Sequence, residues 1–470
     1  MTTQSTAEPL SLEIEQFDRK DVMHGFATLN AQATNEVVVM TEAKGMRVID
    51  HRGREFLDAG GGLWCMNVGY GRQVIADVAA KQMAKLPYFH TFGNFSNEPM
   101  ARLSDRLLKL APPGMTRVVF ASSGSEANDT QIKTVRRYNN LLGRPTKKKI
   151  IARLSSYHGS TVAAGSLSGL PMMHRTFDLP IPGILHTLAT DYHRRPAGIS
   201  TPGQFTQYLI DDLVRLIETE GPDTIAAFIA EPVCGSGGVL VPPEDYFSEV
   251  SKVLDRYDVL MIADEVITGF GRTGSWFASP ELGIKPDLMS IAKGLTSGYF
   301  PMSGCLLSAK VADVLYADKS ADAMFAHGFT WSGHPVGAAI AHANLDIMEQ
   351  ERLPENAARI GAYLIDRLRS KLAEHPLVGE IRGRGLLIGV ELDGDRATRR
   401  PFAEPHRVAS LVSRACFEER LLVRGGHGRV LAALAPPLIA TVGDADEIVA
   451  RLGRVLDRVA GEAKQAGLSA

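Results

Sequence analysis

The stretch DVLMIADEVITGFGRTG, residues 258–274, joins a strand-like apolar run to the spacing Gly269-x-Gly271-x-x-Gly274. In dinucleotide-binding folds such glycines open a helix whose free N–H groups hold a pyrophosphate. Here the residues that follow, RTGSWFASPELGIKPD, are interrupted by Gly and Pro, which predicts a loop. A nicotinamide or flavin site is therefore disfavoured, and Asp264, near the end of the apolar run, is the residue of chemical interest.

Short β-rich runs alternate with longer helical patterns between about residues 116 and 308. Six runs are expected as strands: residues 117–122, 148–154, 224–233, 258–266, 287–293 and 303–309. In residues 207–220 and 244–258, apolar residues recur at intervals of three and four, which predicts helices. Apolar strands alternating with helices indicate an α/β fold, with a mostly parallel sheet covered by helices on both faces.

The sequence pattern changes near residue 335, beyond which helical patterns surround one strand or hairpin, VGEIRGRGLLIGVEL. We predict a large domain over residues 76–335 and a smaller α+β domain over residues 336–470. An N-terminal segment, residues 1–75, is expected to join the smaller domain.

Composition narrows the classes of function. The formal net charge is −2, so no basic field is available for nucleic acid. No run of 18 apolar residues predicts a membrane span, and the acidic N-terminal residues do not resemble a signal peptide. The four cysteines form no CxxC pair and are expected as reduced thiols. These features favour a cytoplasmic enzyme that acts on small molecules.

Four polar residues fall at the carboxyl ends of expected strands: Ser122, Glu231, Asp264 and Lys293. Ligands of parallel α/β sheets bind outside these ends, because the strand ends meet at one edge of the sheet. This coincidence predicts a functional site at that edge.

An anion site is one interpretation of SSGSEANDT, residues 122–130. Ser123-x-x-Glu126 is a capping-box pattern, and Gly124 and Ser125 would offer free N–H groups and a hydroxyl at a helix N-terminus. A capped helix that binds nothing is the alternative. No GxxxxGK[ST] motif occurs, so a nucleoside triphosphate is not the expected anion.

Lys293 and Asp264 could act together. A lysine buried at the end of an apolar strand has a lowered pKa and can serve as an amine nucleophile and base. Asp264 could simply pair with Lys293 or cap a loop. An anion cradle, a buried lysine and an acid are also the groups that pyridoxal phosphate requires.

With these motifs in order, the chain resembles the class III (subgroup II) pyridoxal-phosphate-dependent aminotransferases, in the branch of ω-amino acid and amine:pyruvate transaminases. The likeness runs from about residue 45 to 460 and implies fold type I. The matching stretches are GLWCMNVGYGR (62–72), SSGSEANDT (122–130), YHGSTVA (157–163), FIAEPVCGSGG (228–238), IADEVITGFGRTG (262–274), IAKGLTSGYFPMSG (291–304), HGFTWSGHP (327–335), RGRGL (382–386) and APPLIAT (435–441).

The resemblance implies pyridoxal 5′-phosphate as cofactor, with pyridoxamine phosphate formed in the half-reaction. Lys293 matches the lysine that holds the cofactor covalently and moves the substrate proton, and Asp264 matches the partner of the pyridine nitrogen. Further cofactor contacts are expected from Gly124, Ser125, Tyr157, Glu231, Val266, Phe329 and Thr330, with Phe329 and Thr330 contributed by a second subunit. The resemblance implies a homodimer with active sites at the interface, and a tetramer is the alternative. No metal is expected.

Substrate binding is expected from one arginine and an apolar wall. Arg424 matches the mobile arginine that grips the carboxylate of a keto acid, although Arg424 and Arg429 could be ordinary surface arginines. The wall would consist of Trp64, Phe89, Tyr157 and Ile267, with the partner chain's Phe329. Ser236 and Thr268 depart from the branch pattern, and PYFHTFGNF (87–95) makes a diamine donor doubtful.

The expected reaction moves an amino group from a primary amine or ω-amino acid to pyruvate, giving an aldehyde or ketone and alanine. Alternatives with the same cofactor are a 2-oxoglutarate-dependent aminotransferase, a taurine:pyruvate aminotransferase, an aminomutase, a racemase and a decarboxylase. A ligand-sensing regulator is a further class, but the short N-terminus leaves no room for a fused DNA-binding domain. HExxH and GxSxG are absent, which disfavours zinc and serine hydrolases.

Overall fold

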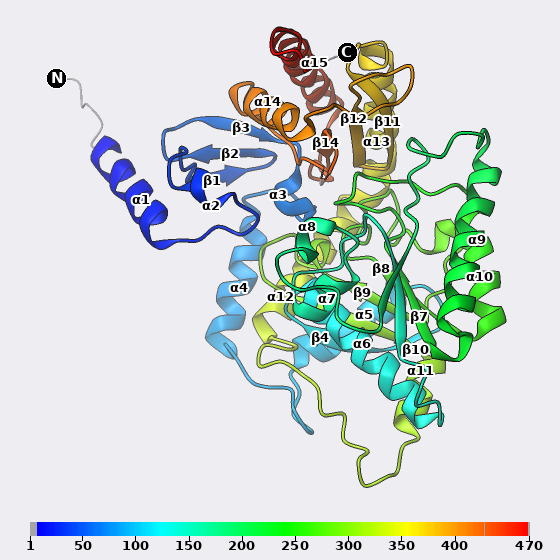
Figure 1. Ribbon diagram of the computed structural model, residues 1–470. Helices are drawn as coiled ribbons and strands as arrows, with labels where there is room; N and C mark the ends of the chain where they lie inside the picture. Colours follow the sequence, from blue (N-terminus) through cyan, green and yellow to red (C-terminus); the bar gives the residue numbers. More distant parts are fainter. Residues whose placement is uncertain (1–6, 427, 469–470) are drawn as a thin grey trace.

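The computed structural model describes residues 7–426 and 428–468 and is built around a seven-stranded sheet (Figure 1). The strands are β4 (Met115–Ala121), β5 (Lys149–Arg153), β6 (Ile184–Thr187), β7 (Ile225–Ala230), β8 (Leu260–Asp264), β9 (Leu288–Ile291) and β10 (Ser303–Ser308). Their order is β4–β10–β9–β8–β7–β5–β6, and only β10 is antiparallel to its neighbours. The expected α/β fold with a mostly parallel sheet is confirmed.

Both faces of this sheet are covered, as the unbroken apolar strands predicted. Every residue of β7 and β8 is buried. Along β8, Leu260 and Ile262 pack into one hydrophobic cluster, whereas Met261 and Ala263 pack into the other. This alternation follows from the two-residue period of a strand.

The helices that cover the sheet contribute to different clusters. On one face lie α6 (Gly124–Leu141), α7 (Val162–Leu167) and α11 (Ala309–Tyr316). On the other lie α5 (Glu98–Leu110), α9 (Pro202–Glu220), α10 (Tyr246–Tyr257) and α12 (Pro335–Gln350). The remaining helices of this part are α3 (Gly61–Trp64), α4 (Gln73–Lys85) and α8 (Pro171–His174).

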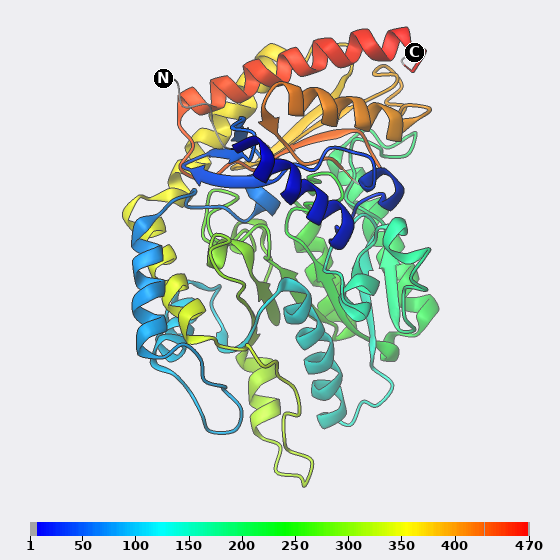
Figure 2. The same cartoon turned by 90° about the vertical axis from the view of Figure 1, so that its left-hand side faces the viewer.

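Two smaller sheets lie at the end of the molecule that carries the chain's C-terminal helices (Figure 2). One joins β1 (Met40–Lys44), β2 (Arg47–Asp50), β3 (Glu55–Asp58) and β13 (Leu421–Leu422), and the other joins β11 (Val378–Arg384), β12 (Leu387–Leu392) and β14 (Leu431–Leu434). The helices of this region are α1 (Ala7–Asp21), α2 (Leu29–Gln32), α13 (Leu353–Leu372), α14 (Pro405–Glu418) and α15 (Val442–Gln465). Because β3 pairs in parallel with β13, a strand of the N-terminal segment completes a sheet with a strand from the C-terminal part.

The glycines of residues 269–274 form a loop, as the sequence predicted. Gly271 has φ +88°, and a Cβ there would lie 2.8 Å from Leu438 Cδ1. Gly274 has φ +102°, and a Cβ there would lie 3.0 Å from Ala358 Cβ. The glycines therefore let this loop pack against the C-terminal part, and the segment up to the 3-10 helix η2 (Pro280–Leu282) contains no helix that could hold a pyrophosphate.

Within residues 7–426 and 428–468, no helix combines the length and the hydrophobicity that a membrane span requires. The four cysteines are free thiols, as expected.

Candidate active site

A cavity lies at the carboxyl edge of the central sheet, where the sequence placed the site. It is lined by Gly124, Ser125, Tyr157, His158, Gly159, Glu231, Asp264, Val266, Ile267, Ala292 and Lys293. These residues follow β4, β5, β7, β8 and β9, so the parallel strands bring together groups that are far apart in the sequence.

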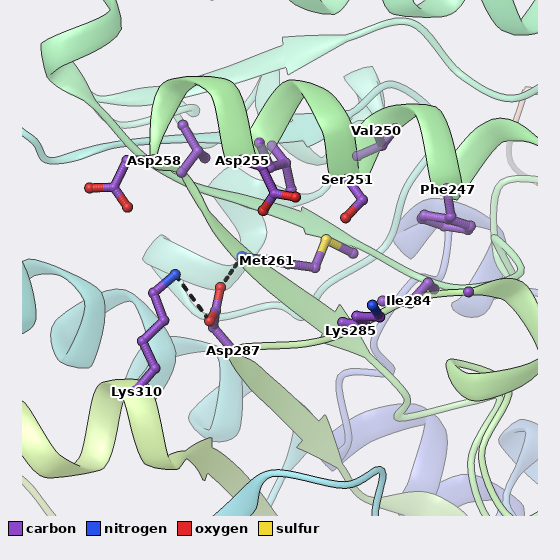
Figure 3. Close-up of a pocket in the computed structure, with 13 residues that line it drawn as sticks. Phe247, Val250, Ser251, Asp255, Asp258, Met261, Ile284, Lys285, Asp287 and Lys310 are labelled. Atoms are coloured by element: carbon purple, nitrogen blue, oxygen red, sulfur yellow. Dashed lines mark hydrogen bonds and ion pairs between the residues drawn. The ribbon is translucent and has the colours of Figure 1, made fainter.

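A second cavity lies at the opposite edge of the sheet, beside the C-terminal end of α10 (Figure 3). Its Asp287 carboxylate accepts a hydrogen bond from the Met261 N–H at 2.9 Å and pairs with Lys310 at 3.4 Å. The Lys310 side chain is half exposed, so its amine is hydrated. This cavity offers no buried amine and does not join the residues predicted from the strand ends.

Asp264 is the acid at the centre of the first cavity. Its carboxylate accepts hydrogen bonds from His158 Nδ1 at 2.7 Å, Asn128 Nδ2 at 2.9 Å and the Val266 N–H at 3.1 Å. Burial alone would raise the pKa of Asp264, but the bonds from His158, Asn128 and Val266 outweigh it and hold the pKa below its usual value. Asp264 is therefore a buried, permanently charged carboxylate.

Lys293 lines the same cavity, is half-buried and begins the 3-10 helix η3 (Lys293–Leu295). Its backbone has φ +43°, a region that non-glycine residues rarely adopt. Burial lowers the pKa of Lys293, and the charge of Arg424 adds to this effect, whereas Asp264 opposes it. The lysine therefore gives up its proton more readily than a surface lysine does, as a nucleophilic amine requires.

Glu231 is a second buried carboxyl group in this cavity. It accepts hydrogen bonds from the Tyr157 N–H at 3.0 Å and the Gly235 N–H at 2.8 Å. Burial raises the pKa of Glu231, and the neighbouring charge of Asp264 acts in the same direction. The surroundings thus shift the pKa values of the two carboxyl groups in opposite directions.

The N-terminus of α6 opens into the cavity through Gly124 and Ser125. A Cβ at residue 124 would lie 3.1 Å from the methyl carbons of Val266, so the two residues pack closely. The Ser123 hydroxyl caps Glu126 N at 3.2 Å. The Glu126 carboxylate accepts from Ser122 N at 2.7 Å rather than from Ser123 N, so only half of the expected capping box forms. The first N–H groups of a helix have no partner within it and can hold an anion.

An apolar wall adjoins the cavity on its other side. A Cβ at Gly235 would lie 2.6 Å from Ile267 Cδ1 and 2.7 Å from Trp64 Cζ3. Trp64 and Ile267 are thus brought together, as the resemblance implied. Thr268, one of the two departures from the branch pattern, is buried and donates its hydroxyl proton to Glu265.

Five predicted residues do not line this cavity within one chain: Trp64, Phe89, Phe329, Thr330 and Arg424. Three of these, Phe89, Phe329 and Thr330, lie in the segments 87–95 and 327–335. Their segments are joined, because Tyr88 donates to the Thr330 carbonyl at 2.9 Å. Both segments extend from the end of the molecule opposite α15 (Figure 2). Several of their large apolar side chains are exposed, including Phe92, Phe95 and Trp331.

Arg424 and Arg429 have different surroundings. Among the described residues, the Arg424 guanidinium has no hydrogen bond and no ion pair, and the residue is exposed. The Arg429 guanidinium pairs with Glu391 at 3.0 Å and with Asp191 at 2.9 Å. Arg429 is therefore not an ordinary surface arginine, because its side chain forms a buried ion pair. The charge of Arg424 has no partner in the described part of the chain and is within electrostatic range of Lys293.

A cluster of His193, Glu391 and Asp393 has ligand atoms close enough to hold a metal ion. However, Glu391 is bound by three arginines, Arg194, Arg382 and Arg429, and Asp393 by Arg194. Guanidinium groups therefore occupy the carboxylate oxygens that a cation would need.

Sequence analysis missed two partners of Asp264, His158 and Asn128. Both lie inside quoted motifs, and Asn128 is one helical turn beyond Gly124, on the face of α6 that begins in the cavity. That spacing was a usable signal for Asn128. His158 directly follows Tyr157, but nothing in the sequence indicated that its ring turns toward Asp264.

Comparison with known proteins identifies the family. Residues 28–456 match the model of the class-III aminotransferases. The chain belongs to that family. It is 47% identical over 446 residues to a diaminobutyrate–2-oxoglutarate transaminase of Halomonas elongata, covering 94% of this chain and 95% of the relative. A putrescine–pyruvate aminotransferase of Pseudomonas aeruginosa is 42% identical, covering 90% and 91%.

A class III aminotransferase of solved structure has the same fold. The ω-transaminase of Pseudomonas jessenii, crystallised in complex with PMP, aligns with a TM-score of 0.93 at 39% identity, covering 99% of this chain and all of the other. Class III aminotransferases use pyridoxal phosphate. The residues present here fit that group: a charged acid and a buried amine share one cavity with an open helix N-terminus.

Proposed function

We propose that the protein is an ω-aminotransferase that transfers an amino group from a primary amine or ω-amino acid to pyruvate. The products are an aldehyde or ketone and alanine. The observation that carries this proposal is the guanidinium of Arg424, which has no partner among the described residues. A Cβ at Gly60, directly before helix α3 and its Trp64, would lie 3.6 Å from Arg424 Cγ. One cation beside an apolar wall suits a monocarboxylate acceptor and a donor without an α-carboxylate.

In this proposal the residues at the cofactor side have the following roles. Lys293 would hold the cofactor covalently and would move the Cα proton of the substrate. Asp264 keeps the pyridine nitrogen protonated, because its charge is fixed by three hydrogen bonds. When bound, pyridoxal phosphate supplies a ring that accepts the electrons of the broken Cα–H bond.

Other residues position the cofactor in this proposal. The N–H groups of Gly124 and Ser125 hold the phosphate, and Val266 and Tyr157 cover the two faces of the ring. Glu231 remains protonated beside it, since burial raises its pKa. Phe329 and Thr330 would complete the site from a second subunit, which gives a homodimer, and Phe89 would belong to the apolar wall.

Neighbouring arginines support a monocarboxylate rather than a dicarboxylate acceptor. Arg272 donates to the carbonyls of Leu386 and Pro436, and Arg429 is bound to carboxylates. Neither is free to grip a second carboxylate. The names of the two relatives indicate different amino-group acceptors, because one relative is a 2-oxoglutarate enzyme and the other a pyruvate enzyme.

The test is a comparison of acceptors with purified holoenzyme. With 1-phenylethylamine, β-alanine, taurine or putrescine as donor, we expect alanine from pyruvate to exceed glutamate from 2-oxoglutarate by at least about tenfold in kcat/KM. Glutamate formation at an equal or higher kcat/KM would overturn the pyruvate assignment and favour a 2-oxoglutarate-dependent enzyme.

A further inference from the structure

The loop from Arg424 to Val430 is held at its start, near its end by the Arg429 side chain, and at Val430, which is buried and accepts a hydrogen bond from Leu392 N at 2.9 Å. At its start, the backbone of Arg424 exchanges two hydrogen bonds with Ala433, at 3.1 and 2.8 Å. Near its end, the Arg429 side chain is only 13% exposed and is bound to Glu391 and Asp191. Of the two arginines of the loop, Arg424 therefore has a side chain without a partner among the described residues, and Arg429 is fixed to the body of the protein.

The partner of Arg429 is charged under all ordinary conditions. Burial opposes ionisation of Glu391, but the charges of Arg382, Arg429 and Arg194 outweigh it and lower its pKa to about 2. Without Arg429, the Glu391 carboxylate would still be bound by Arg382 at 2.6 Å and Arg194 at 2.8 Å. The network can therefore lose one arginine and keep Glu391 paired.

The stem of Arg429 also touches the turn that borders the cavity. A Cβ at Gly238, where φ is +131°, would lie 2.7 Å from Arg429 Cδ. That turn begins at Gly235. The Gly235 N–H donates a hydrogen bond to Glu231, and a Cβ at Gly235 would lie 2.7 Å from Trp64 Cζ3. Arg429 thus connects the loop of Arg424 to the wall of the cavity.

Glycines surround the fixed point. A Cβ at Gly426 would lie 2.8 Å from Arg429 Cγ, so the loop backbone presses against the Arg429 stem. Gly425 and Gly428 have open space where a side chain would be, and Gly428 has φ +77°. These glycines add no side-chain packing, so among the described residues between Arg424 and Val430 the attachment to the body of the protein is made by Arg429.

We propose that Arg429 is a positioning residue for acceptor selectivity. By fixing the 424–430 loop to Glu391, Asp191 and the turn at Gly238, it sets where the Arg424 guanidinium meets the carboxylate of the keto acid. This inference rests on the proposed function, in which Arg424 binds that carboxylate.

The experiment separates the two half-reactions of the holoenzyme. Conversion of the pyridoxal form by 1-phenylethylamine and of the pyridoxamine form by pyruvate are each followed by absorbance. For Arg429→Gln we expect the half-saturating pyruvate concentration to rise about tenfold, because a small displacement of the carboxylate-binding group weakens only that substrate. The rate with 1-phenylethylamine should stay within about twofold of wild type. Arg429→Lys should fall in between, since lysine cannot bridge two carboxylates as the guanidinium does.

Arg194→Gln is the matched control, because Arg194 binds the same Glu391 carboxylate but lies outside the loop. We expect it to leave the pyruvate concentration dependence unchanged. If both half-reactions weaken equally in Arg429→Gln, or if Arg194→Gln causes the same pyruvate effect, the positioning role is wrong. Should Arg429→Gln fail to fold, Asp191→Asn removes one partner only, and an unchanged pyruvate dependence there overturns the proposal.

Arg424→Ala distinguishes failure of this inference from failure of the proposed function. If Arg424→Ala weakens pyruvate use and Arg429→Gln does not, only the inference on Arg429 falls. If Arg424→Ala leaves pyruvate use unchanged, the proposed acceptor site falls and the inference with it.

Discussion

The cofactor side and the acceptor side of the cavity are built in opposite ways. Asp264 is buried and accepts three hydrogen bonds, so its position and charge are set before any ligand arrives. Arg424 is exposed, and its guanidinium has no partner among the described residues. A group that serves both half-reactions benefits from preorganisation, whereas a group that one substrate needs and the other avoids must be able to move.

The largest effect is expected from Lys293→Ala, because the proposed function uses this amine as the base in both half-reactions. Turnover should fall by at least about a thousandfold. Borohydride treatment of the variant should leave no pyridoxyl adduct on the peptide that spans residue 293. Lys310→Ala, in the cavity of Figure 3, is the matched control and should retain both activity and the adduct. An active Lys293→Ala enzyme would contradict the role given to this lysine.

The second prediction compares the two buried carboxyl groups. Asp264→Asn removes a permanent charge, so both half-reactions should slow by about a hundredfold or more. Glu231→Gln replaces a group whose pKa burial already raises, so its rates should change by less than about tenfold. Single-turnover rates measure both effects. Equal losses in the two variants would show that charge at residue 264 is not what matters.

The third prediction concerns the acceptor side. Arg424→Ala should raise the half-saturating pyruvate concentration by about ten- to a hundredfold, because a charge-assisted pair is lost. Conversion of the pyridoxal form by 1-phenylethylamine should be spared, since that donor has no carboxylate. The ratio of the two effects is the measurement, and an equal loss in both half-reactions would argue against a carboxylate-specific arginine.

Much of the central fold could be predicted, because its strands are apolar runs between helical patterns. The short strand β6, Ile184–Thr187, was missed: two of its four residues are only half buried, so the apolar signal is weak. Residues at strand ends, such as Asp264 and Lys293, were predictable because parallel strands align their carboxyl ends at one edge.

Side-chain partners from distant segments could not be predicted in the same way. Whether Arg424 or Arg429 is free depends on Glu391 and Asp191, which lie far away in the sequence. Likewise, the ring of His158 reaches Asp264 across 106 positions of sequence. Such pairings depend on tertiary packing and leave no local periodicity. The roles given to Phe329 and Thr330 stay predictions, since they depend on a second subunit, and so does the role given to Phe89, which does not line the cavity.

The smallest effect expected is on stability, and it uses the same carboxyl pair. Because burial raises the pKa of Glu231 above its ordinary 4.5, its protonated form stabilises the fold fully below that pH, and this contribution is lost as pH rises through the folded-state pKa. Glutamine does not titrate, so the unfolding free energy of wild type should fall relative to that of Glu231→Gln as pH rises above about 4.5, the ordinary pKa of glutamate. Thermal midpoints of the two holoenzymes should diverge by a few degrees in that direction. Glu244→Gln, at an exposed residue, is the control and should show no such divergence. If the thermal midpoints of wild type and Glu231→Gln differ by a constant amount at all these pH values, Glu231 is already ionised beside Asp264. The contrast between the two carboxyl groups would then be wrong.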